Sequence, residues 1–145
     1  MPGYKQISIT LPETLLSQIE SRVDSCGPYD NRSQLIAECL DRYLRAIDSA
    51  KKNLLGMMSD AELNYIMDCN NGTIYTASTV TLIYANIEDS QEDGLSEKWE
   101  VDGKSLAAKI RDLDYIHCAA LVDAIGKFWQ SVSAGNQLEV RDALR

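Results

Sequence analysis

The sequence predicts a mainly helical protein with one short N-terminal strand and two regions of different design. Three observations indicate this class. An alternating apolar run at residues 7–11 stops at Pro12, apolar residues then recur at helical spacing as far as about residue 53, and a new set of helix caps and apolar helical faces occupies residues 57–132.

The strand is predicted over residues 5–11, where apolar and polar side chains alternate with a period of two. One face carries the apolar residues Ile7, Ile9 and Leu11, and the other carries the polar residues Gln6, Ser8 and Thr10. Pro12 cannot donate a ladder hydrogen bond, so it ends the strand and opens a helix. No neighbouring segment offers a second strand, so we expect the partner to come from a distant segment or from a second copy of the chain.

Two helices follow the strand. The first is expected over residues 13–24, and Cys26-Gly27-Pro28-Tyr29-Asp30 is typical of a turn. The second begins near Asn31 to Ser33 and continues to about Asn53. It carries a wide apolar stripe of Leu35, Ile36, Cys39, Leu40, Tyr43, Leu44 and Ile47. Leu54-Leu55-Gly56 then marks a boundary, which predicts an N-terminal domain over residues 1–53.

The second domain is predicted to be helical over residues 57–132. Ser59 and Glu62 have the spacing of a capping box, and the helix they start should end at Asn71-Gly72. Residues 73–87 hold many β-branched side chains, but their apolar residues suit one helical face better than a strand. Two further helices are expected over residues 104–113 and 115–132, followed by a polar, frayed tail over residues 133–145 with a short helix at its end.

The charge distribution limits the classes of partner. The formal net charge is −8, which disfavours unspecific adhesion to nucleic acid or to anionic membranes but leaves room for a site-specific DNA reader. No apolar run approaches the roughly 18 residues of a membrane span. The N-terminus lacks the pattern of a secretory signal, so we expect a cytoplasmic protein with no membrane partner.

No residue cluster indicates catalysis, a metal or another cofactor. The four cysteines contain no C-x-x-C pair, and the single histidine, His117, is expected to be an ordinary helix residue with a satisfied ring nitrogen. Residues 89–100 partly match a calcium-binding EF-hand loop, but Gln91 and Ser96 depart from that pattern, so a solvated acidic loop is the prediction. No phosphate-binding glycine loop or nucleophile motif is present, and we expect no enzyme activity.

Residues 4–48 resemble the ribbon-helix-helix family of DNA-binding dimers, the Arc and methionine-repressor class. The resemblance rests on a strand, two helices and a glycine-containing turn, and on the segment "NRSQLI" at the start of the second helix. It implies an intertwined homodimer in which one strand from each chain pairs into a two-stranded antiparallel ribbon. The dimer core would then contain Ile7, Ile9, Leu11, Ile36 and Leu40.

The resemblance also implies two sets of DNA contacts. The outward ribbon face would place Gln6, Ser8 and Thr10 against base edges in the major groove, where glutamine can pair bidentately with adenine. The N-terminus of the second helix would contact DNA phosphates through Asn31, Arg32 and Ser33, because a helix N-terminus attracts anions. Family members often carry Arg or Lys on the outward strand face, whereas this chain carries Gln6 there.

The expected function is that of a sequence-specific transcriptional regulator that binds double-stranded DNA as a homodimer. We expect it to repress transcription. The C-terminal domain would mediate oligomerisation or bind a small ligand or a protein partner. Two alternatives are an antitoxin of a toxin–antitoxin pair and an adaptor that uses its N-terminal module only to dimerise. Free toxin-wrapping segments are usually unfolded, whereas residues 57–132 carry the apolar faces of a folded domain.

Overall fold

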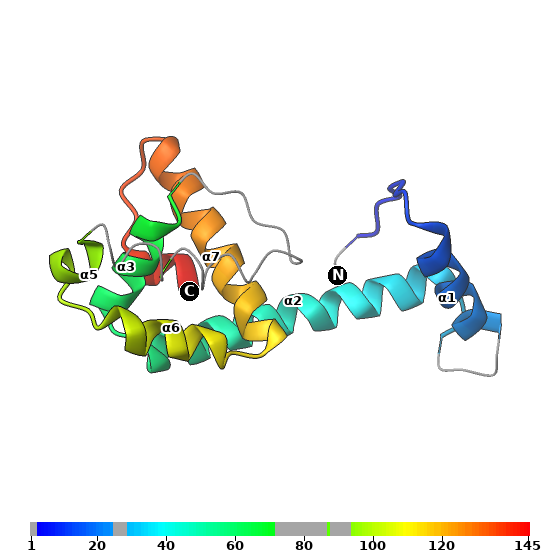
Figure 1. Ribbon diagram of the computed structural model, residues 1–145. Coiled ribbons are helices and arrows are strands. Elements are labelled where there is room, and N and C mark those ends of the chain that lie inside the picture. Colours follow the sequence, from blue (N-terminus) through cyan, green and yellow to red (C-terminus); the bar gives the residue numbers. More distant parts are fainter. Residues whose placement is uncertain (1–2, 25–28, 72–86, 88–93) are drawn as a thin grey trace. The chain divides into compact units, whose positions relative to one another are not determined.

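The computed structural model describes residues 3–24, 29–71, 87 and 94–145 (Figure 1). The chain divides into two units, one from Met1 to Tyr43 and one from Leu44 to Arg145. We call them the N-terminal unit and the C-terminal unit. The division falls within helix α2 (Arg32–Met57), so this one helix contributes residues to both units.

The N-terminal unit contains helix α1 (Glu13–Asp24) and the first part of α2. The α1 helix has the bounds that the sequence predicts, and the Leu16 N–H donates to the Pro12 carbonyl in its first turn at 3.0 Å. Pro12 thus opens the helix, where its missing N–H and restricted φ cost nothing.

The predicted strand at residues 5–11 is wrong for this structure. Residues 3–12 form neither strand nor helix, and no strand occurs among the described residues, so no β-ribbon is present and the expected ribbon-helix-helix architecture is corrected. The physical reason is that an alternating pattern specifies which side chains would share one face of a strand, but not which second strand its backbone would pair with. A strand needs a second backbone to bond with, and the described part of this chain supplies none. The description as mainly helical holds.

Helix α2 is longer than the sequence analysis predicts, because it continues through Leu54-Leu55-Gly56 to Met57. Leu54 is fully buried and Met58 is 3% exposed, so the segment expected to be a boundary packs into the core of the C-terminal unit. A glycine inside a helix costs about 1 kcal/mol relative to alanine. The burial of Leu54 and Met58 offsets that cost at Gly56.

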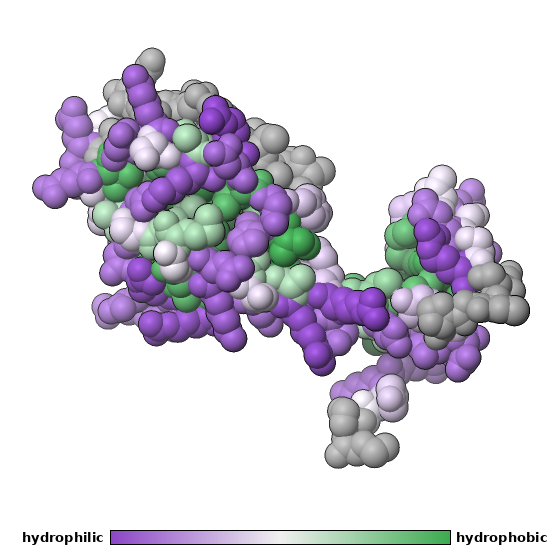
Figure 2. Space-filling model, turned by 90° about the horizontal axis from the view of Figure 1, so that it is seen from below, coloured by the Kyte–Doolittle hydropathy of each residue, from purple (hydrophilic) through white to green (hydrophobic). Residues whose placement is uncertain are grey.

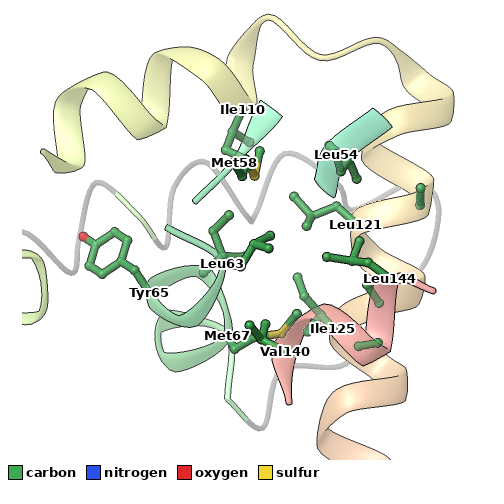
Figure 3. Packing of buried hydrophobic residues seen from close by; sticks show 14 of the residues in the cluster. Leu54, Met58, Leu63, Tyr65, Met67, Ile110, Leu121, Ile125, Val140 and Leu144 are labelled. Carbon is green, nitrogen blue, oxygen red and sulfur yellow. The ribbon is translucent and has the colours of Figure 1, made fainter. Parts of the chain in front are cut away.

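The C-terminal unit is built from the end of α2 and from α3 (Asp60–Cys69), α5 (Leu95–Lys98), α6 (Gly103–Arg111), α7 (Tyr115–Ser133) and the 3-10 helix η2 (Val140–Leu144). Figure 3 shows side chains from the end of α2 and from α3, α6, α7 and η2 converging on one core. The fully buried large side chains include Leu54, Leu63, Tyr65, Ile66, Leu106, Leu121 and Leu144. The predicted helices near residues 104–113 and 115–132 are confirmed by α6 and α7.

Helix caps define where these elements start. The predicted capping box at Ser59 is confirmed: the Ser59 hydroxyl accepts from the Glu62 N–H at 3.1 Å, and the Glu62 carboxylate accepts from the Ser59 N–H at 3.0 Å. Asp102 caps α6 by accepting from the Lys104 and Ser105 N–H groups, and Asp114 caps α7 by accepting from the His117 N–H.

The C-terminal segment packs against the core. Gly135, with φ of 82°, adopts the left-handed conformation that ends α7 and redirects the chain. The short terminal helix that the sequence predicts is η2, which lies next to the C-terminus in Figure 1. The expectation of a frayed tail is wrong, because Val140, Ala143 and Leu144 of η2 are buried in the core. Arg141 connects η2 to the rest of the unit, donating to the Asp60 carboxylate and to the carbonyls of Leu55 and Met58.

Two sequence predictions lie partly outside the described residues: the helix expected over residues 73–87, of which only Ile87 is described, and residues 89–93 of the acidic loop that partly matches an EF-hand. Ile87 is fully buried, and its carbonyl accepts from the Tyr65 hydroxyl at 3.3 Å. The rest of the predicted loop is described and contains helix α5. In the part of the chain that the structure covers, no helix is long and apolar enough to cross a membrane.

Candidate interaction site of the N-terminal unit

The N-terminal unit contains an apolar groove of about 350 Å³. Residues 9–11 and α1 form one side of it and the first turns of α2 form the other. Its lining consists of Ile9, Leu11, Leu15, Gln18, Ile19, Arg22, Leu35, Ile36, Cys39 and Leu40. Only Gln18 and Arg22 of this set are polar, and the Arg22 guanidinium donates to the Gln18 carbonyl at 2.9 Å. The groove is therefore built to contact apolar groups.

The groove is open because the unit buries few side chains. Of its described apolar residues, only Ile19 at 9% exposure and Leu35 at 5% are buried. Ile7 is 79% exposed, Ile9 55% and Leu40 55%. Figure 2 shows hydrophobic side chains on the surface of this unit. An exposed apolar patch of this kind is typical of an interaction surface.

Four of the five residues expected in the dimer core meet at this groove. Ile9, Leu11, Ile36 and Leu40 all line it, although they come from the N-terminal segment and from α2. Ile7 does not line the groove and extends into solvent. The sequence thus predicted which residues form one apolar surface, while the structure shows that a single chain leaves this surface uncovered.

The three residues expected to contact bases, Gln6, Ser8 and Thr10, are all exposed. They lie in the irregular N-terminal segment, so no hydrogen-bonded ribbon orients them together. Their side chains nevertheless are available to solvent, and they combine an amide with two hydroxyl groups that can donate and accept hydrogen bonds.

The start of α2 is a well-defined N-terminus. Asn31 is the cap residue: its Oδ1 accepts from the Gln34 N–H at 2.8 Å. The Gln34 side chain reaches back and accepts from the Asp30 N–H, also at 2.8 Å. The sequence predicts that Asn31 lies at this terminus. The role of Gln34 was not predicted, although the N-x-x-Q spacing could have indicated it.

Arg32 and Ser33 occupy the first turn of α2, where helix geometry leaves the backbone N–H groups without intrahelical acceptors. Both side chains are exposed. The Arg32 guanidinium lies 3.4 Å from a carboxylate oxygen of Glu20, with side-chain exposures of 59% and 50%. A surface pair of this kind contributes about 0–1 kcal/mol, so Arg32 can exchange Glu20 for another anion at little cost.

The chemically reactive residues of the C-terminal unit do not form a comparable site. Both ring nitrogens of His117 have partners, Asp114 Oδ1 at 2.6 Å and Asn53 Nδ2 at 3.2 Å, which confirms its structural role. The hydrogen bond from the His117 N–H, followed by that from its ring, lowers the pKa of Asp114. Among the described residues, no group of three or more His, Cys, Asp or Glu side chains could hold a metal ion.

The described cysteines, Cys39, Cys69 and Cys118, carry free thiols. Cys39 is exposed and lines the apolar groove, whereas Cys69 and Cys118 are half-buried in the C-terminal unit. Burial raises the pKa of the Cys118 thiol, and the Asp114 carboxylate raises it further. Cys39 is therefore the most accessible thiol of the three. The reactive form of a cysteine is its thiolate.

Comparison with models of protein families, with curated proteins and with solved structures found no match for this chain.

Proposed function

We propose that the protein is a cytoplasmic DNA-binding transcriptional regulator, a repressor, that acts as a homodimer through its N-terminal unit. The observation that carries the proposal is the open apolar groove. A unit that buries only Ile19 and Leu35 among its described apolar residues, and leaves a groove of about 350 Å³ open, has the surface of one half of an assembly.

DNA contact is supported by the polar surface of the same unit. Gln6, Ser8 and Thr10 are exposed and can exchange hydrogen bonds with base edges. The first turn of α2 offers backbone N–H groups at the positive end of a helix dipole, and Arg32 adds a cation that forms a surface pair with Glu20. Residues of both kinds are needed, because phosphate contacts position a protein on DNA and base contacts select a sequence.

The charge of the unit sets the expected strength of binding. Residues 1–43 contain Lys5, Arg22, Arg32 and Arg42 against six acidic residues. Release of counterions from DNA supplies much of the affinity of DNA-binding proteins and scales with the number of phosphates neutralised. We therefore expect modest affinity for one dimer and a requirement for repeated half-sites.

The C-terminal unit has its own core. In our proposal it binds an effector or a protein partner, or mediates oligomerisation. Its buried core is formed by residues of one chain, from Ile47 to Leu144. A toxin-wrapping segment is usually unfolded when free, so this core counts against the antitoxin alternative. The free thiols of Cys39, Cys69 and Cys118 are suited to the reducing cytoplasm.

The test is fluorescence anisotropy with labelled DNA from the upstream region of the protein's own gene, measured over a series of salt concentrations. We expect specific binding by the wild type and its loss in a Gln6→Ala/Ser8→Ala/Thr10→Ala variant. Arg32→Ala should weaken binding to all sequences equally and reduce the salt dependence by about one phosphate contact. The matched control is Arg111→Ala, since Arg111 is a similarly exposed arginine, in the C-terminal unit, paired with Asp112 at 3.6 Å.

Two results would contradict the proposal. One is an absence of sequence-specific binding at low salt to any upstream fragment, which would leave the adaptor alternative, in which the N-terminal unit serves only to dimerise. The other is an equal loss of binding in the Arg32→Ala and Arg111→Ala variants, which would show that general charge and not the α2 N-terminus contacts DNA.

A further inference from the structure

We infer that a cavity in the C-terminal unit binds a small amine that carries one positive charge and one apolar group. The cavity has a volume of about 300 Å³ and lies where η2 and the segment before it meet α3 and α7. This inference rests on the proposed function in one respect, that the C-terminal unit receives an effector. It adds the place of the site and the chemical class of the ligand.

The walls of the cavity belong to elements that are packed into the core. Its lining includes Asp60 and Asn64 of α3, Phe128 of α7, Leu138 and Glu139 of the preceding segment, and Arg141 of η2. The η2 helix packs against both α3 and α7, and its Val140 and Leu144 are buried among their side chains (Figure 3). Ligand sites in proteins have volumes of roughly 300–1,000 Å³, so this cavity accommodates one small molecule.

The charge of the lining favours a cation. Two carboxylates, those of Asp60 and Glu139, and one guanidinium, that of Arg141, line the cavity. Two negative charges and one positive charge leave one negative charge in excess. A ligand with a single positive charge neutralises this lining, whereas the lining repels an anion.

The Arg141 guanidinium is occupied by the protein itself. Its Nε donates to the Asp60 carboxylate, its Nη1 to the Leu55 carbonyl at 3.3 Å, and its Nη2 to the Met58 carbonyl at 3.4 Å. All three guanidinium nitrogens therefore have acceptors in the protein, and the positive charge is paired with Asp60. Arg141 thus forms a wall of the cavity and does not offer a site for an anionic ligand.

Two hydrogen-bond acceptors of the lining remain for a ligand. Asn64 Nδ2 donates to the Asp60 backbone carbonyl at 2.9 Å, which leaves Asn64 Oδ1 without a donor among the described residues. The carboxylate of the exposed Glu139 likewise has neither a hydrogen bond nor an ion pair within the described part of the chain. An ammonium group has three N–H donors and no acceptor, so it matches a site that offers acceptors alone.

The apolar part of the lining suits the body of an organic ligand. Phe128 and Leu138 are both half-buried and line the cavity. Trp129 packs edge-on against Phe128 with ring centroids 5.0 Å apart, and the Trp129 N–H donates to the Met67 carbonyl at 3.1 Å. The Phe128 ring is thus held in place, and an aromatic face attracts both cations and apolar groups. A bare metal ion would leave this apolar surface unused.

The first experiment is isothermal titration calorimetry on the full wild-type chain with three probes of similar shape and different charge. The probes are 2-phenylethylammonium, the neutral 2-phenylethanol and the anionic 3-phenylpropanoate. We expect one ammonium probe to bind per chain, and the other two to bind at least about tenfold more weakly, because they lose the charge-assisted hydrogen bonds. Equal affinities for the three probes would overturn the inference, as would an absence of saturable binding of 2-phenylethylammonium at millimolar concentrations.

The second experiment places the site by substitution. Glu139→Gln keeps the size of an exposed side chain and removes its charge, so it should weaken binding of 2-phenylethylammonium at least about tenfold. Asn64→Ala should weaken it by a smaller factor, because a neutral acceptor is lost. The matched control is Glu97→Gln in α5, which removes the same charge from an exposed glutamate outside the cavity and should leave the affinity unchanged.

The outcomes of the substitutions are decisive in both directions. An unchanged affinity in Glu139→Gln, or an equal loss in Glu139→Gln and Glu97→Gln, would show that the amine binds elsewhere or responds to the total charge, and would overturn the inference. A selective loss in Glu139→Gln would support it.

These results are distinguishable from the test of the proposed function. Binding of 2-phenylethylammonium at Glu139, with no sequence-specific DNA binding in its presence or absence, would support the site and contradict the proposed regulator. Sequence-specific DNA binding by a chain that binds no amine would overturn the inference and leave the proposed DNA binding in place.

Discussion

The two units of this protein are made from similar helices and reach opposite degrees of burial. In the C-terminal unit, Leu54, Leu63, Ile66, Leu121 and Leu144 are at most 1% exposed, whereas the N-terminal unit buries only Ile19 and Leu35 among its described apolar residues. Helix α2 contains both an exposed and a completely buried leucine. Leu40 near its middle is 55% exposed, while Leu54, fourteen residues later, is completely buried.

This difference shows that an apolar helical stripe predicts a contact but not its partner. The C-terminal unit brings several elements to one core (Figure 3) and satisfies their apolar faces within one chain. The N-terminal unit has two helices and an irregular segment, which are too few to enclose a core. The C-terminal unit is therefore expected to be stable by itself, and the N-terminal unit is expected to depend on association.

The largest expected effect comes from replacing one leucine in each unit by alanine. Leu63→Ala should lower the free energy of unfolding of the C-terminal unit by about 3 kcal/mol, because the side chain is completely buried and its removal leaves a cavity. Leu40→Ala should cost less than about 1 kcal/mol at concentrations that keep the protein monomeric, since exposed positions contribute little. Urea denaturation followed by circular dichroism measures both, and equal costs would contradict the comparison.

The next effect concerns the attachment of η2 to the core. Arg141→Ala should destabilise the C-terminal unit by about 2 kcal/mol, because the half-buried carbonyls of Leu55 and Met58 lose a donor and the Asp60 carboxylate loses its cation. Thermal unfolding should show the loss in the C-terminal transition alone. Arg145→Ala is the control, since its guanidinium pairs only with Asp142 at the exposed C-terminus.

A smaller effect compares one helix cap in each unit. Ser59→Ala and Asn31→Ala each remove a side-chain acceptor from a helix N-terminus, and each change should cost about 1 kcal/mol. If the units behave as proposed, Ser59→Ala lowers stability equally at all protein concentrations, whereas the effect of Asn31→Ala appears as a weaker dimer. Concentration-dependent unfolding curves distinguish the two, and identical behaviour would show that the units unfold together.

The smallest expected effect is a pH dependence confined to the C-terminal unit. Burial acts to raise the pKa of Glu62, but the hydrogen bond from the Ser59 N–H and the Lys109 ammonium at 2.9 Å outweigh it and lower the pKa below the ordinary value of 4.5. A lowered folded pKa stabilises the protein above pH 4.5, and this stabilisation is lost as the pH falls through the folded value.

The measurement is the melting temperature of wild type and Glu62→Gln between pH 6 and pH 3. The wild type should lose more of its stability over this interval than Glu62→Gln, because the glutamine variant has no proton to gain at that position. A parallel decline of the two proteins would assign the pH dependence to other carboxylates.

Much of the local structure follows from the sequence. Pro12 opens α1, Ser59 and Glu62 form a capping box, and α6 and α7 begin within a residue of their predicted starts. These features depend on neighbours within one helical turn, which the sequence displays directly. The N-x-x-Q cap of α2, formed by Asn31 and Gln34, is of the same local kind and was missed.

The predicted strand and the predicted end of α2 at about Asn53 could not be corrected from the sequence. Ile7, Ile9 and Leu11 alternate as in a strand, but strand formation depends on a hydrogen-bonding partner at another place. Leu54-Leu55-Gly56 suggests a boundary because glycine disfavours helix, but the packing of Leu54 against the C-terminal core continues the helix. Both outcomes depend on contacts between distant residues.

The sequence by itself therefore determined where α1, α3, α6 and α7 approximately lie, how they begin, and which side chains share an apolar face, because periodicity and capping are properties of nearby residues. It predicted neither α5 nor the last turn of α2. Only the tertiary structure decided which apolar faces are covered. Leu40 and Leu54 are both apolar residues of α2. Residues of α3, α6, α7 and η2 form a core around Leu54, whereas nothing in the described chain covers Leu40. Burial depends on what the rest of the chain can bring to a face.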